Sequence, residues 1–382
     1  MKIHVLIQAR SSSKRLPFKS LLNIDKYFSI ELLYKRIKSK MYNTTVLISK
    51  DTSDDYFAHL LKKKKINLFR GSLFNVKKRF LSFTKKFKNE DIIIRLTGDN
   101  LFIDKKLIKL AIKELITQKK DYLFISNKFS NLPLGISVEI FRYLYLKKNN
   151  NFSKLDKEHV TYSFDKHKNN SIKIREEKKF WKKLVCTMDY LENYHLIKKT
   201  FESIKNPLTI SWQKLLKVMD KIKRKKVNYK NDFKLISIQS KKLTKKIIID
   251  ISKLKMQEWN FSLKSHIKYF NDTLKENEIN NMIYLNDKLI GYTLHRKKKL
   301  YKSNSYVLID TVIINKNYRK KNLGTILMNF NNNEIIKSKL PAYLQCKTEH
   351  IKFYKNFSWK EVDKKNKILI QSKSNLRLMS FN

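Results

Sequence analysis

Short apolar runs alternate with amphipathic stretches over the first quarter of the chain, and this alternation restricts the fold more than any other feature. The runs have the length of strands, and the stretches between them repeat their apolar residues with the period of a helix. We expect strands at Ile3–Ile7, Thr45–Ser49, Asn67–Phe69 and Ile92–Leu96, and helices at Ile30–Lys38, Asp54–Lys63 and Asn75–Phe87. This order predicts an α/β domain with a doubly wound, parallel or mixed sheet that helices cover on both faces.

Glycine is unusually scarce, with only Gly71, Gly98, Gly135, Gly291 and Gly324 among 382 residues. An average protein is roughly 7% glycine, which would place more than about two dozen in a chain of this length. Such a chain is expected to keep glycine where no other residue can adopt the backbone conformation, or where a ligand touches the main chain. The loops around these glycines are therefore candidate functional loops.

The formal charge of +52 favours a nucleic-acid partner at first sight. However, only 12 of the 85 basic residues are arginine, the side chain preferred for bidentate contacts with phosphates and bases. The lysines are also spread along the whole chain. We attribute most of the charge to the coding bias of an A/T-rich genome. We expect small anionic substrates in a positive pocket and no specific nucleic-acid partner.

The two cysteines, Cys186 and Cys346, are far apart in the sequence, so neither a disulfide framework nor a zinc site is expected. No apolar run reaches membrane-spanning length, and the apolar core of Met1–Gln8 is too short for a signal peptide. We therefore expect a cytoplasmic protein without a membrane span.

The loop after the first expected strand combines cations with hydroxyl groups. Its backbone amides could wrap a triphosphate while its cations neutralise the phosphate charge. The alternative is a solvated basic turn before a helix, but two arginines so close together are uncommon in an arginine-poor chain. The residues of this loop that we expect to bind nucleotide are Ala9, Arg10, Ser12, Ser13, Arg15 and Lys19.

Two aspartates follow apolar runs at positions that would be strand ends. Asp99 comes after Ile92–Leu96 and directly follows Gly98, and Asp189 comes after the strand-like run Leu184–Met188. A carboxylate at a strand end suits a magnesium ion that is bound to nucleotide phosphates. A Gly-Asp turn alone is a weak signal, since most such turns are only turns. The sequence does not show whether the two carboxylates meet.

Several short motifs, in a fixed order over about residues 1–228, resemble the cytidylyltransferases that activate acidic sugars. The closest resemblance is to the acylneuraminate cytidylyltransferase-like group of spore coat polysaccharide biosynthesis. The motifs are Ile7–Arg10 with Arg15–Lys19, Phe69–Ser72, Val76 with Arg79–Phe80, Arg95–Asp99 with Ile103–Asp104, Leu132–Gly135 with Val138–Glu139, Glu158–Thr161 and Thr187–Asp189.

The resemblance implies a nucleotidyltransferase-like domain over residues 1–230. By the resemblance, Arg10 and Lys19 act in catalysis and, with Arg15, bind the phosphates of CTP, while Asp99 and Asp189 hold Mg²⁺. Arg70 and Gly98 complete the implied nucleotide site. The chain departs from the family pattern by lacking glycine at Ser12 and Phe18 and aspartate at Asn75 and Ser137. These departures indicate that the activity could be weakened or altered.

The resemblance fades near the charged stretch Lys221–Asn231, and residues 233–382 form a second domain-sized segment. Its apolar pattern predicts a smaller α+β domain with an antiparallel sheet and helices at its ends or faces. We expect helices at Leu243–Trp259, Asn322–Ile336 and Ile351–Phe357, and strands at Met282–Leu285, Leu289–Leu294, Tyr306–Ile314, Tyr343–Cys346 and Ile368–Ile370.

A basic loop leads from one of these strands directly into the amino terminus of a helix. Such a terminus presents backbone amides and a positive dipole end to an anion, although an ordinary strand-to-helix turn has the same short pattern. The order of elements resembles a GNAT-type N-acetyltransferase, in which Arg-x-x-Gly-x-Gly binds the pyrophosphate of acetyl-CoA. The residues matched to that site are Ile314, Arg319, Asn322, Leu323, Gly324 and Thr325.

The same resemblance implies that Tyr354 protonates the departing thiolate of coenzyme A. A core aromatic residue is the alternative interpretation of Tyr354. A general base is also needed to take a proton from the acceptor amine, and Asp310 is a weak candidate beside a relayed water. Asn322 and Ser358 stand where the family has glycine.

These patterns lead to a two-domain enzyme of glycan precursors as the main hypothesis. One half would form a CMP-sugar from CTP and an acidic, nonulosonate-like sugar. The other half would acetylate an amino sugar or related amine with acetyl-CoA. The alternatives are a basic protein that binds RNA or another anionic polymer through degenerate enzyme domains, and a chain with one active half. A homodimer is left open.

Overall fold

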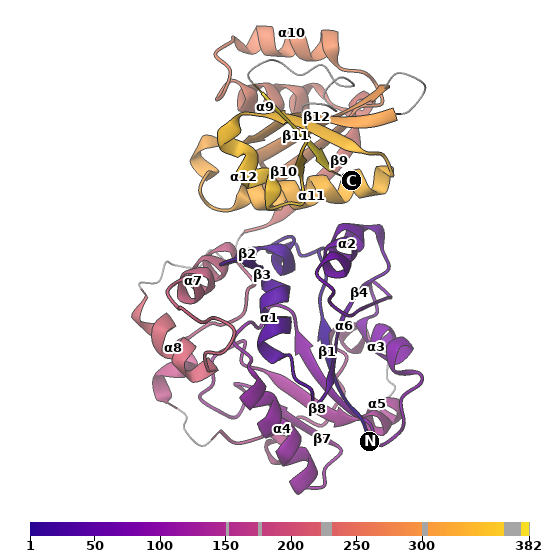
Figure 1. Ribbon diagram of the computed structural model, residues 1–382, viewed down its shortest axis with the longest axis vertical. Coiled ribbons are helices and arrows are strands. Elements are labelled where there is room, and N and C mark those ends of the chain that lie inside the picture. The colour runs from indigo at the N-terminus through magenta and orange to yellow at the C-terminus, as the bar shows by residue number, and fades with distance from the viewer. Residues whose placement is uncertain (150–152, 175–177, 223–230, 300–304, 363–375, 382) are drawn as a thin grey trace. The chain divides into compact units, whose positions relative to one another are not determined.

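The computed structural model describes residues 1–149, 153–174, 178–222, 231–299, 305–362 and 376–381. The chain divides into two compact units, Met1–Tyr229 and Lys230–Asn382, which are described separately (Figure 1). Most of the stretch Lys221–Asn231, where the sequence places the boundary, lies outside the described residues, as does the expected strand Ile368–Ile370.

The first unit is built on a six-stranded mixed sheet, which confirms the α/β prediction. The strand order is β5-β4-β1-β6-β8-β7. The first four strands are parallel, and β8 is antiparallel to both β6 and β7. The strands are β1 (Ile3–Gln8), β4 (Asn43–Ser49), β5 (Leu68–Gly71), β6 (Ile92–Thr97), β7 (Tyr122–Ile125) and β8 (Val138–Arg142), with the short pair β2 (Asn23–Ile24) and β3 (Tyr27–Phe28).

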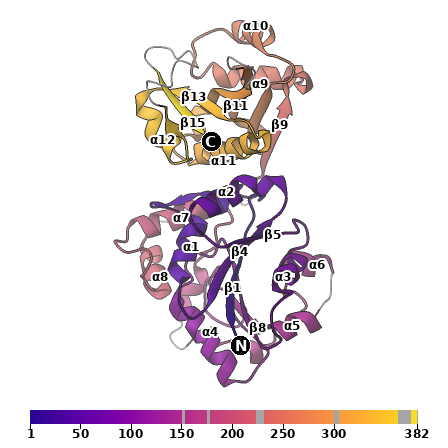
Figure 2. The same cartoon turned by 45° about the vertical axis from the view of Figure 1, so that its right-hand side comes forward.

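Helices cover both faces of this sheet, and Figure 2 shows α1 and α4 on the side opposite to α3, α5 and α6. On the α3 side, Leu6, Leu47, Ile93 and Phe141 from four strands pack against Phe80 in one buried cluster. The helices are α1 (Ser29–Ile37), α2 (Asp55–Lys63), α3 (Val76–Thr84), α4 (Lys105–Thr117), α5 (Tyr143–Lys148), α6 (Lys154–His159), α7 (Leu191–Glu202) and α8 (Trp212–Lys221).

Two expected elements of the first unit differ in the structure. The run Leu184–Met188 forms no strand and makes only one isolated bridge, between Leu134 and Val185. The helix expected to reach Phe87 ends at Thr84. Asn75 directly precedes that helix, and its side chain accepts a 2.8 Å hydrogen bond from the amide of Lys78, so asparagine serves as the helix cap here.

The second unit is an α+β domain around a seven-stranded sheet, as expected. Its order is β14-β15-β13-β12-β11-β10-β9, and every pair is antiparallel except β12 with β13. The expectation of a wholly antiparallel sheet is therefore wrong at this pair. The strands are β9 (Phe233–Gln239), β10 (Ile279–Leu285), β11 (Lys288–Lys299), β12 (Ser305–Ile314), β13 (Ala342–Cys346), β14 (Lys360–Glu361) and β15 (Arg377–Phe381).

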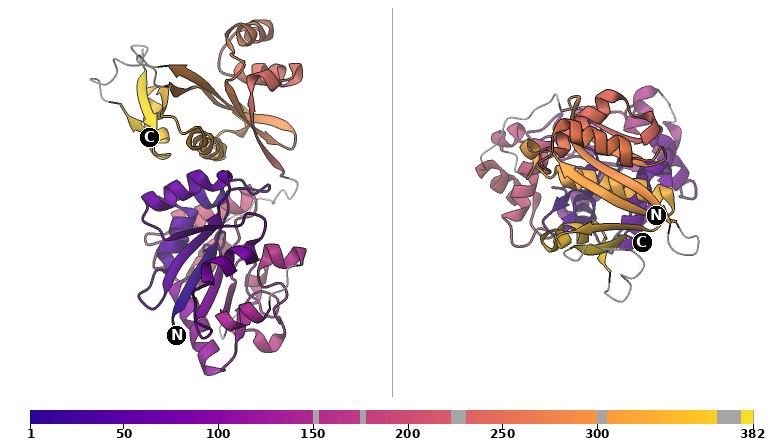
Figure 3. Two further views of the ribbon diagram at one scale, coloured as in Figure 1. Left: turned by 90° about the vertical axis from the view of Figure 1, so that its right-hand side faces the viewer. Right: turned by 90° about the horizontal axis from the view of Figure 1, so that it is seen from above.

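Alternating residues of β11 separate two helical layers of this unit. Tyr292 and Leu294 join the buried cluster of α9 (Lys245–Lys255) and α10 (Leu263–Thr273), whereas Thr293 contacts Asn331 of α11 (Leu323–Ser338). The left view of Figure 3 shows α11 on the other side of the sheet from the α9–α10 pair. The last helix, α12 (Ile351–Lys355), is shorter than expected.

The hairpin between β10 and β11 is the one the sequence predicts. Asn286 and Asp287 connect the strands, and both have positive φ, 49° and 61°. Two-residue hairpin turns of this kind favour asparagine and aspartate because these residues tolerate the left-handed region.

Within the described residues, no helix is both long enough and apolar enough to cross a bilayer. Both cysteines are buried, and no disulfide joins them. No cluster of three or more histidine, cysteine, aspartate or glutamate side chains suited to a metal ion is present among those residues.

Candidate active site

A cavity of about 850 Å³ lies in the first unit, at the carboxyl ends of β1 and β6. The loop after β1 and the turn after β6 contribute most of the residues that we expected to bind nucleotide. The predicted residues that line the cavity are Ala9, Arg10, Ser12, Ser13, Arg15, Lys19, Gly98, Asp99 and Asp189. The structure thus brings together residues that are up to 180 positions apart in the chain.

Lys19 lies between the two predicted metal ligands. Its Nζ donates hydrogen bonds to Asp99 Oδ2 and, at 2.9 Å, to Asp189 Oδ1. Arg15 approaches Asp189 Oδ1 to 3.0 Å. Burial opposes the charge of the Lys19 ammonium, but the two carboxylates outweigh it and raise the pKa of Lys19. Burial likewise opposes ionisation of Asp99, whereas Lys19 and nearby hydrogen bonds lower its pKa. Lys19 and Asp99 are therefore both charged at neutral pH.

The buried carboxylate of Asp54 anchors the loop after β1 through hydrogen bonds. Its Oδ1 accepts from the Ser11 amide at 2.7 Å, and its Oδ2 accepts from the Ser49 amide and hydroxyl at 2.9 and 2.6 Å. The loop closes when the Phe18 amide donates to the Ser11 carbonyl at 3.0 Å. Phe18 has φ of 53°, so it takes the left-handed conformation that the family pattern gives to glycine.

Arg79 supports the same loop through main-chain carbonyls. Its guanidinium donates to the carbonyls of Ser72 at 2.7 and 2.9 Å, Ala9 at 3.3 Å and Leu47 at 3.2 Å. Burial lowers the pKa of Arg79 to about 10, so it stays charged at neutral pH. A Cβ at Gly71 would lie 2.6 Å from Arg79 Cγ, which explains why glycine stands there.

Gly135 is required by close main-chain packing. Its φ is 101°, and an added Cβ would lie 2.6 Å from the backbone of Cys186 and Thr187. The Cys186 amide donates to the Leu134 carbonyl at 2.7 Å. These contacts fix the segment that leads to Asp189, so the second carboxylate reaches the cavity from a segment that is not a regular strand.

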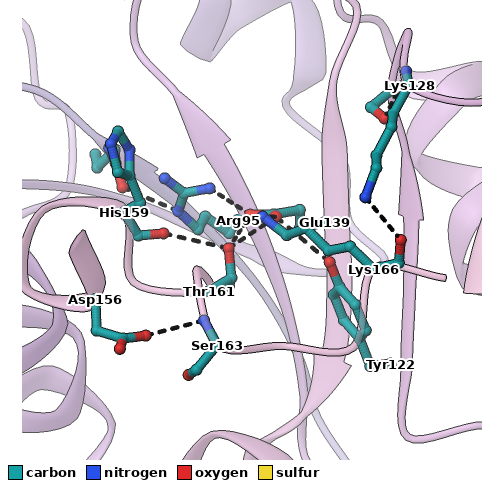
Figure 4. A network of polar contacts seen from close by, with 11 residues as sticks. Arg95, Tyr122, Lys128, Glu139, Asp156, His159, Thr161, Ser163 and Lys166 are labelled. Carbon is teal, nitrogen blue, oxygen red and sulfur yellow. Dashed lines mark hydrogen bonds and ion pairs between the residues drawn. The ribbon is translucent and has the colours of Figure 1, made fainter. Parts of the chain in front are cut away.

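The wall of the cavity near α6 rests on the buried carboxylate of Glu139 (Figure 4). It accepts from Arg95 Nη1, from Lys166 Nζ at 3.1 Å and from the Thr161 hydroxyl at 2.7 and 2.8 Å. Arg95 Nε also donates to the side chain of Gln8 at 3.0 Å. Burial opposes ionisation of Glu139, but Arg95 and Lys166 lower its pKa. The carboxylate is therefore ionised and orients Arg95 at the cavity.

The network continues through an unusual backbone turn. Val160 has φ of 56° and ψ of −52°, a region that β-branched residues rarely enter. This turn places Thr161 on Glu139 and its neighbours Glu158 and His159 in the cavity lining. Glu158 lies 3.6 Å from Arg10 on the loop after β1.

The prediction of individual site residues missed part of this lining. Arg79, Arg95, Gly135, Glu158 and His159 all belong to motifs that carried the family resemblance, and that was the signal that could have added them. One predicted nucleotide ligand lies elsewhere. Arg70 is absent from the cavity lining and donates to the carbonyls of Ser49 and Asp51, each at 2.9 Å, and to Asp55 Oδ1 at 2.6 Å. Arg70 therefore links β5 to the segment that follows β4.

Comparison with known proteins identifies a family whose matched region contains the cavity. The family described as cytidylyltransferase matches residues 4–247, which include all of the elements that line it. The chain belongs to the cytidylyltransferase family. A solved cytidylyltransferase structure from Leptospira borgpetersenii is 28% identical, with a TM-score of 0.51, and the match covers 58% of this chain and 94% of that one.

Two curated proteins are similar over shorter stretches of this chain. An uncharacterized protein of Methanocaldococcus jannaschii is 36% identical over 165 residues, which are 42% of this chain and 66% of that protein. The spore coat polysaccharide biosynthesis protein SpsF of Bacillus subtilis is 35% identical over 142 residues, which are 35% of this chain and 57% of that protein. The chain therefore spans less than two thirds of the length of both.

The second unit places the predicted coenzyme A residues around the start of α11. Asn322 precedes the helix with φ of 60°, a conformation that suits asparagine. Arg319 donates from Nε to the Ile314 carbonyl at 2.9 Å and from Nη2 to Glu258. A Cβ at Gly324 would meet only the Phe353 ring, at 3.4 Å, which is ordinary contact. Packing therefore does not explain glycine at this position. Leu323 is buried, and Thr325 lies in the first turn.

The two predicted acid–base residues of this unit have different surroundings. Tyr354 is buried on α12, and burial, together with the nearby Cys346, raises the pKa of its hydroxyl above the usual value, so it stays protonated. Asp310 accepts from Arg296 Nε at 2.5 Å, and Arg296 Nη1 also donates to Glu278 at 2.8 Å. As a base, Asp310 would have to act while paired with this guanidinium.

Proposed function

We propose that the first unit transfers the cytidylyl group of CTP to a hydroxyl of an acidic, nonulosonate-like sugar. The observation that carries the proposal is the convergence of Arg10, Arg15 and Lys19 with two carboxylates in one cavity at the carboxyl ends of parallel strands. Cations opposite carboxylates suit a nucleotide triphosphate that brings its own metal ion. Family membership and the likeness to SpsF support the same chemistry.

The transfer joins the sugar oxygen to the α-phosphorus of CTP and breaks the bond from that phosphorus to the bridging oxygen of pyrophosphate. Arg10, Arg15 and Lys19 would bind the phosphates and stabilise the charge that develops on the leaving pyrophosphate. The loop after β1, held by Asp54 and Arg79, would align the phosphates for attack. The cavity wall around Arg95 and His159 is left for the sugar.

Asp99 and Asp189 fit the implied magnesium ion because they supply carboxylate oxygens that already converge on one cationic group. Mg²⁺ is usually held by one or two carboxylates together with substrate phosphates. When bound, the ion would neutralise phosphate charge and polarise the attacked phosphorus.

The test is release of pyrophosphate by the purified full chain from CTP, MgCl₂ and a panel of 2-keto sugar acids. Asp99→Asn should lower the rate roughly 10²-fold or more, since it removes a group that would act on developing charge. Asp25→Asn is the matched control, because Asp25 is exposed in a turn, and asparagine tolerates its φ of 53°. Absence of pyrophosphate with every acid, or equal rates for Asp99→Asn and wild type, would refute the proposal.

For the second unit we propose transfer of an acetyl group from acetyl-CoA to an amino sugar or related amine. Strands β12 and β13 pair in parallel only from Val307 to Ile309, although β12 continues to Ile314. The remaining part of β12 has no partner strand on that side among the described residues and leads to the start of α11. Separated parallel strands beside a helix amino terminus suit an extended ligand with a diphosphate.

Calorimetric titration of acetyl-CoA into the full chain tests this second activity. We expect saturable binding of acetyl-CoA. Coenzyme A should compete with acetyl-CoA for the site, whereas CTP should not. If acetyl-CoA gives no saturable heat while CTP does, only the first unit is active.

A further inference from the structure

The ion pairs of Lys19 with Asp99 and Asp189 determine under which conditions a metal ion can bind these two carboxylates. The exposed fractions of the Lys19, Asp99 and Asp189 side chains are only 15%, 17% and 18%. Arg15 supplies a second cation at 3.0 Å from Asp189 Oδ1. The four side chains carry two positive and two negative charges, so the cluster is neutral without an ion.

The backbone of Lys19 is anchored, and its side chain is the part that can move. The Lys19 carbonyl accepts from the Ser29 hydroxyl at 2.7 Å and from the Leu22 amide at 3.3 Å. The side chain, by contrast, is flexible and lines a cavity of about 850 Å³. The ammonium can therefore leave the carboxylates without any rearrangement of the loop.

We propose that Lys19 is an internal cation that holds Asp99 and Asp189 against free Mg²⁺ and turns to the phosphates when nucleotide and ion arrive together. The proposal rests on the metal role of the two carboxylates in the proposed function. A free ion would have to displace the ammonium and leave it beside Arg15 in a half-buried place without a counter-charge. A triphosphate gives the displaced ammonium a new anionic partner. Ion and nucleotide binding are thus coupled.

The test titrates MgCl₂ alone into the nucleotide-free full chain by calorimetry. Wild type should give no saturable heat in the millimolar range, whereas Lys19→Met should bind Mg²⁺ at least roughly tenfold more tightly. Thermal melts give a second readout. Lys19→Met should melt below wild type in EDTA and regain stability in MgCl₂, while the melting temperature of wild type stays unchanged. Lys19→Gln repeats the test with a polar side chain.

Lys14→Met is the matched control, because Lys14 lines the same cavity, and no ion pair joins it to either carboxylate among the described residues. It should behave as wild type. Adding Asp189→Asn to Lys19→Met should abolish the gained magnesium affinity. The proposal is wrong if wild type binds Mg²⁺ alone as tightly as Lys19→Met, or if Lys14→Met gains equal affinity. The titration uses no nucleotide, so failure to release pyrophosphate would refute the proposed function without deciding this result.

Discussion

Three of the four positions where glycine was expected keep the backbone conformation that glycine favours. Phe18, Asn322 and Ser358 have φ of 53°, 60° and 70°, whereas Ser12 is not in the left-handed region. A side chain in that region costs roughly 1–2 kcal/mol per residue. The loops at Phe18 and Asn322 therefore retain their geometry at a cost in stability, and the loss of glycine there does not by itself predict loss of function.

Ser358→Gly should raise the free energy of unfolding of the second unit by about 1 kcal/mol, because glycine removes the strain of a positive φ. Chemical denaturation of the full chain measures the change. Ser338→Gly is the control, since Ser338 lies in the last turn of α11, where glycine should destabilise. Equal effects at both serines would contradict the strain argument.

At the scale of elements, the sequence predicted what depends on local pattern. The four strands and three helices expected up to Leu96 and the hairpin at Asn286 follow from periodicity and turn chemistry, and the structure confirms them, although α3 ends before Phe87. The parallel pairing of β12 with β13 depends on residues some 35 positions apart, which local pattern does not report. The run Leu184–Met188 has strand composition, but its segment packs against Gly135 and has only one bridge.

The site was predictable only in part for the same reason. The loop after β1 is continuous in the sequence, so its cations and hydroxyls could be recognised together. The bond between Arg95 and Glu139 depends on β8 returning antiparallel beside β6, which the alternation of strands and helices does not predict. The meeting of Asp99 with Asp189 depends on contacts between distant segments, such as the 3.2 Å hydrogen bond from the Met188 amide to the Asp99 carbonyl.

Glu139→Gln should lower the free energy of unfolding by about 3–5 kcal/mol at neutral pH, because Arg95 and Lys166 would lose their buried counter-charge. The folded state lowers the pKa of Glu139 from 4.5. Its contribution is therefore complete above about pH 4.5 and is lost as the pH falls through the lower folded value.

The difference between Glu139→Gln and wild type should accordingly shrink in acid, which urea denaturation across pH 3–7 would measure. Glu90→Gln is the control, since Glu90 is exposed in a turn and should change stability little. A difference that stays constant down to pH 3 would contradict the assignment of the ionised form.

At the scale of the whole molecule, each unit has its own buried cluster, so we expect two unfolding transitions in calorimetry of the full chain. Met282→Ala should lower the free energy of unfolding of the second unit by roughly 2–5 kcal/mol. Phe141→Ala should lower that of the first unit by a similar amount. CTP with MgCl₂ should raise only the transition that Phe141→Ala lowers. A single transition that responds to all three would contradict independent units.

The net charge of +52 leaves a polymer-binding role as the competing interpretation of the whole chain. That role predicts tight RNA binding that falls steeply with salt and no saturable binding of CTP or acetyl-CoA. The cavity favours the enzyme, because Arg10, Arg15 and Lys19 pair with carboxylates around one pocket.

The contacts of Arg79 have a consequence for how such a chain can change over time. A coding bias toward A and T, to which we attribute the excess of lysine, favours lysine codons, and some arginine codons are one base change from a lysine codon. Lysine has one nitrogen, and it cannot reach the carbonyls of Ser72, Ala9 and Leu47 together, as the guanidinium of Arg79 does. We therefore expect replacement of Arg79 by lysine to be tolerated poorly, even though the coding bias favours lysine.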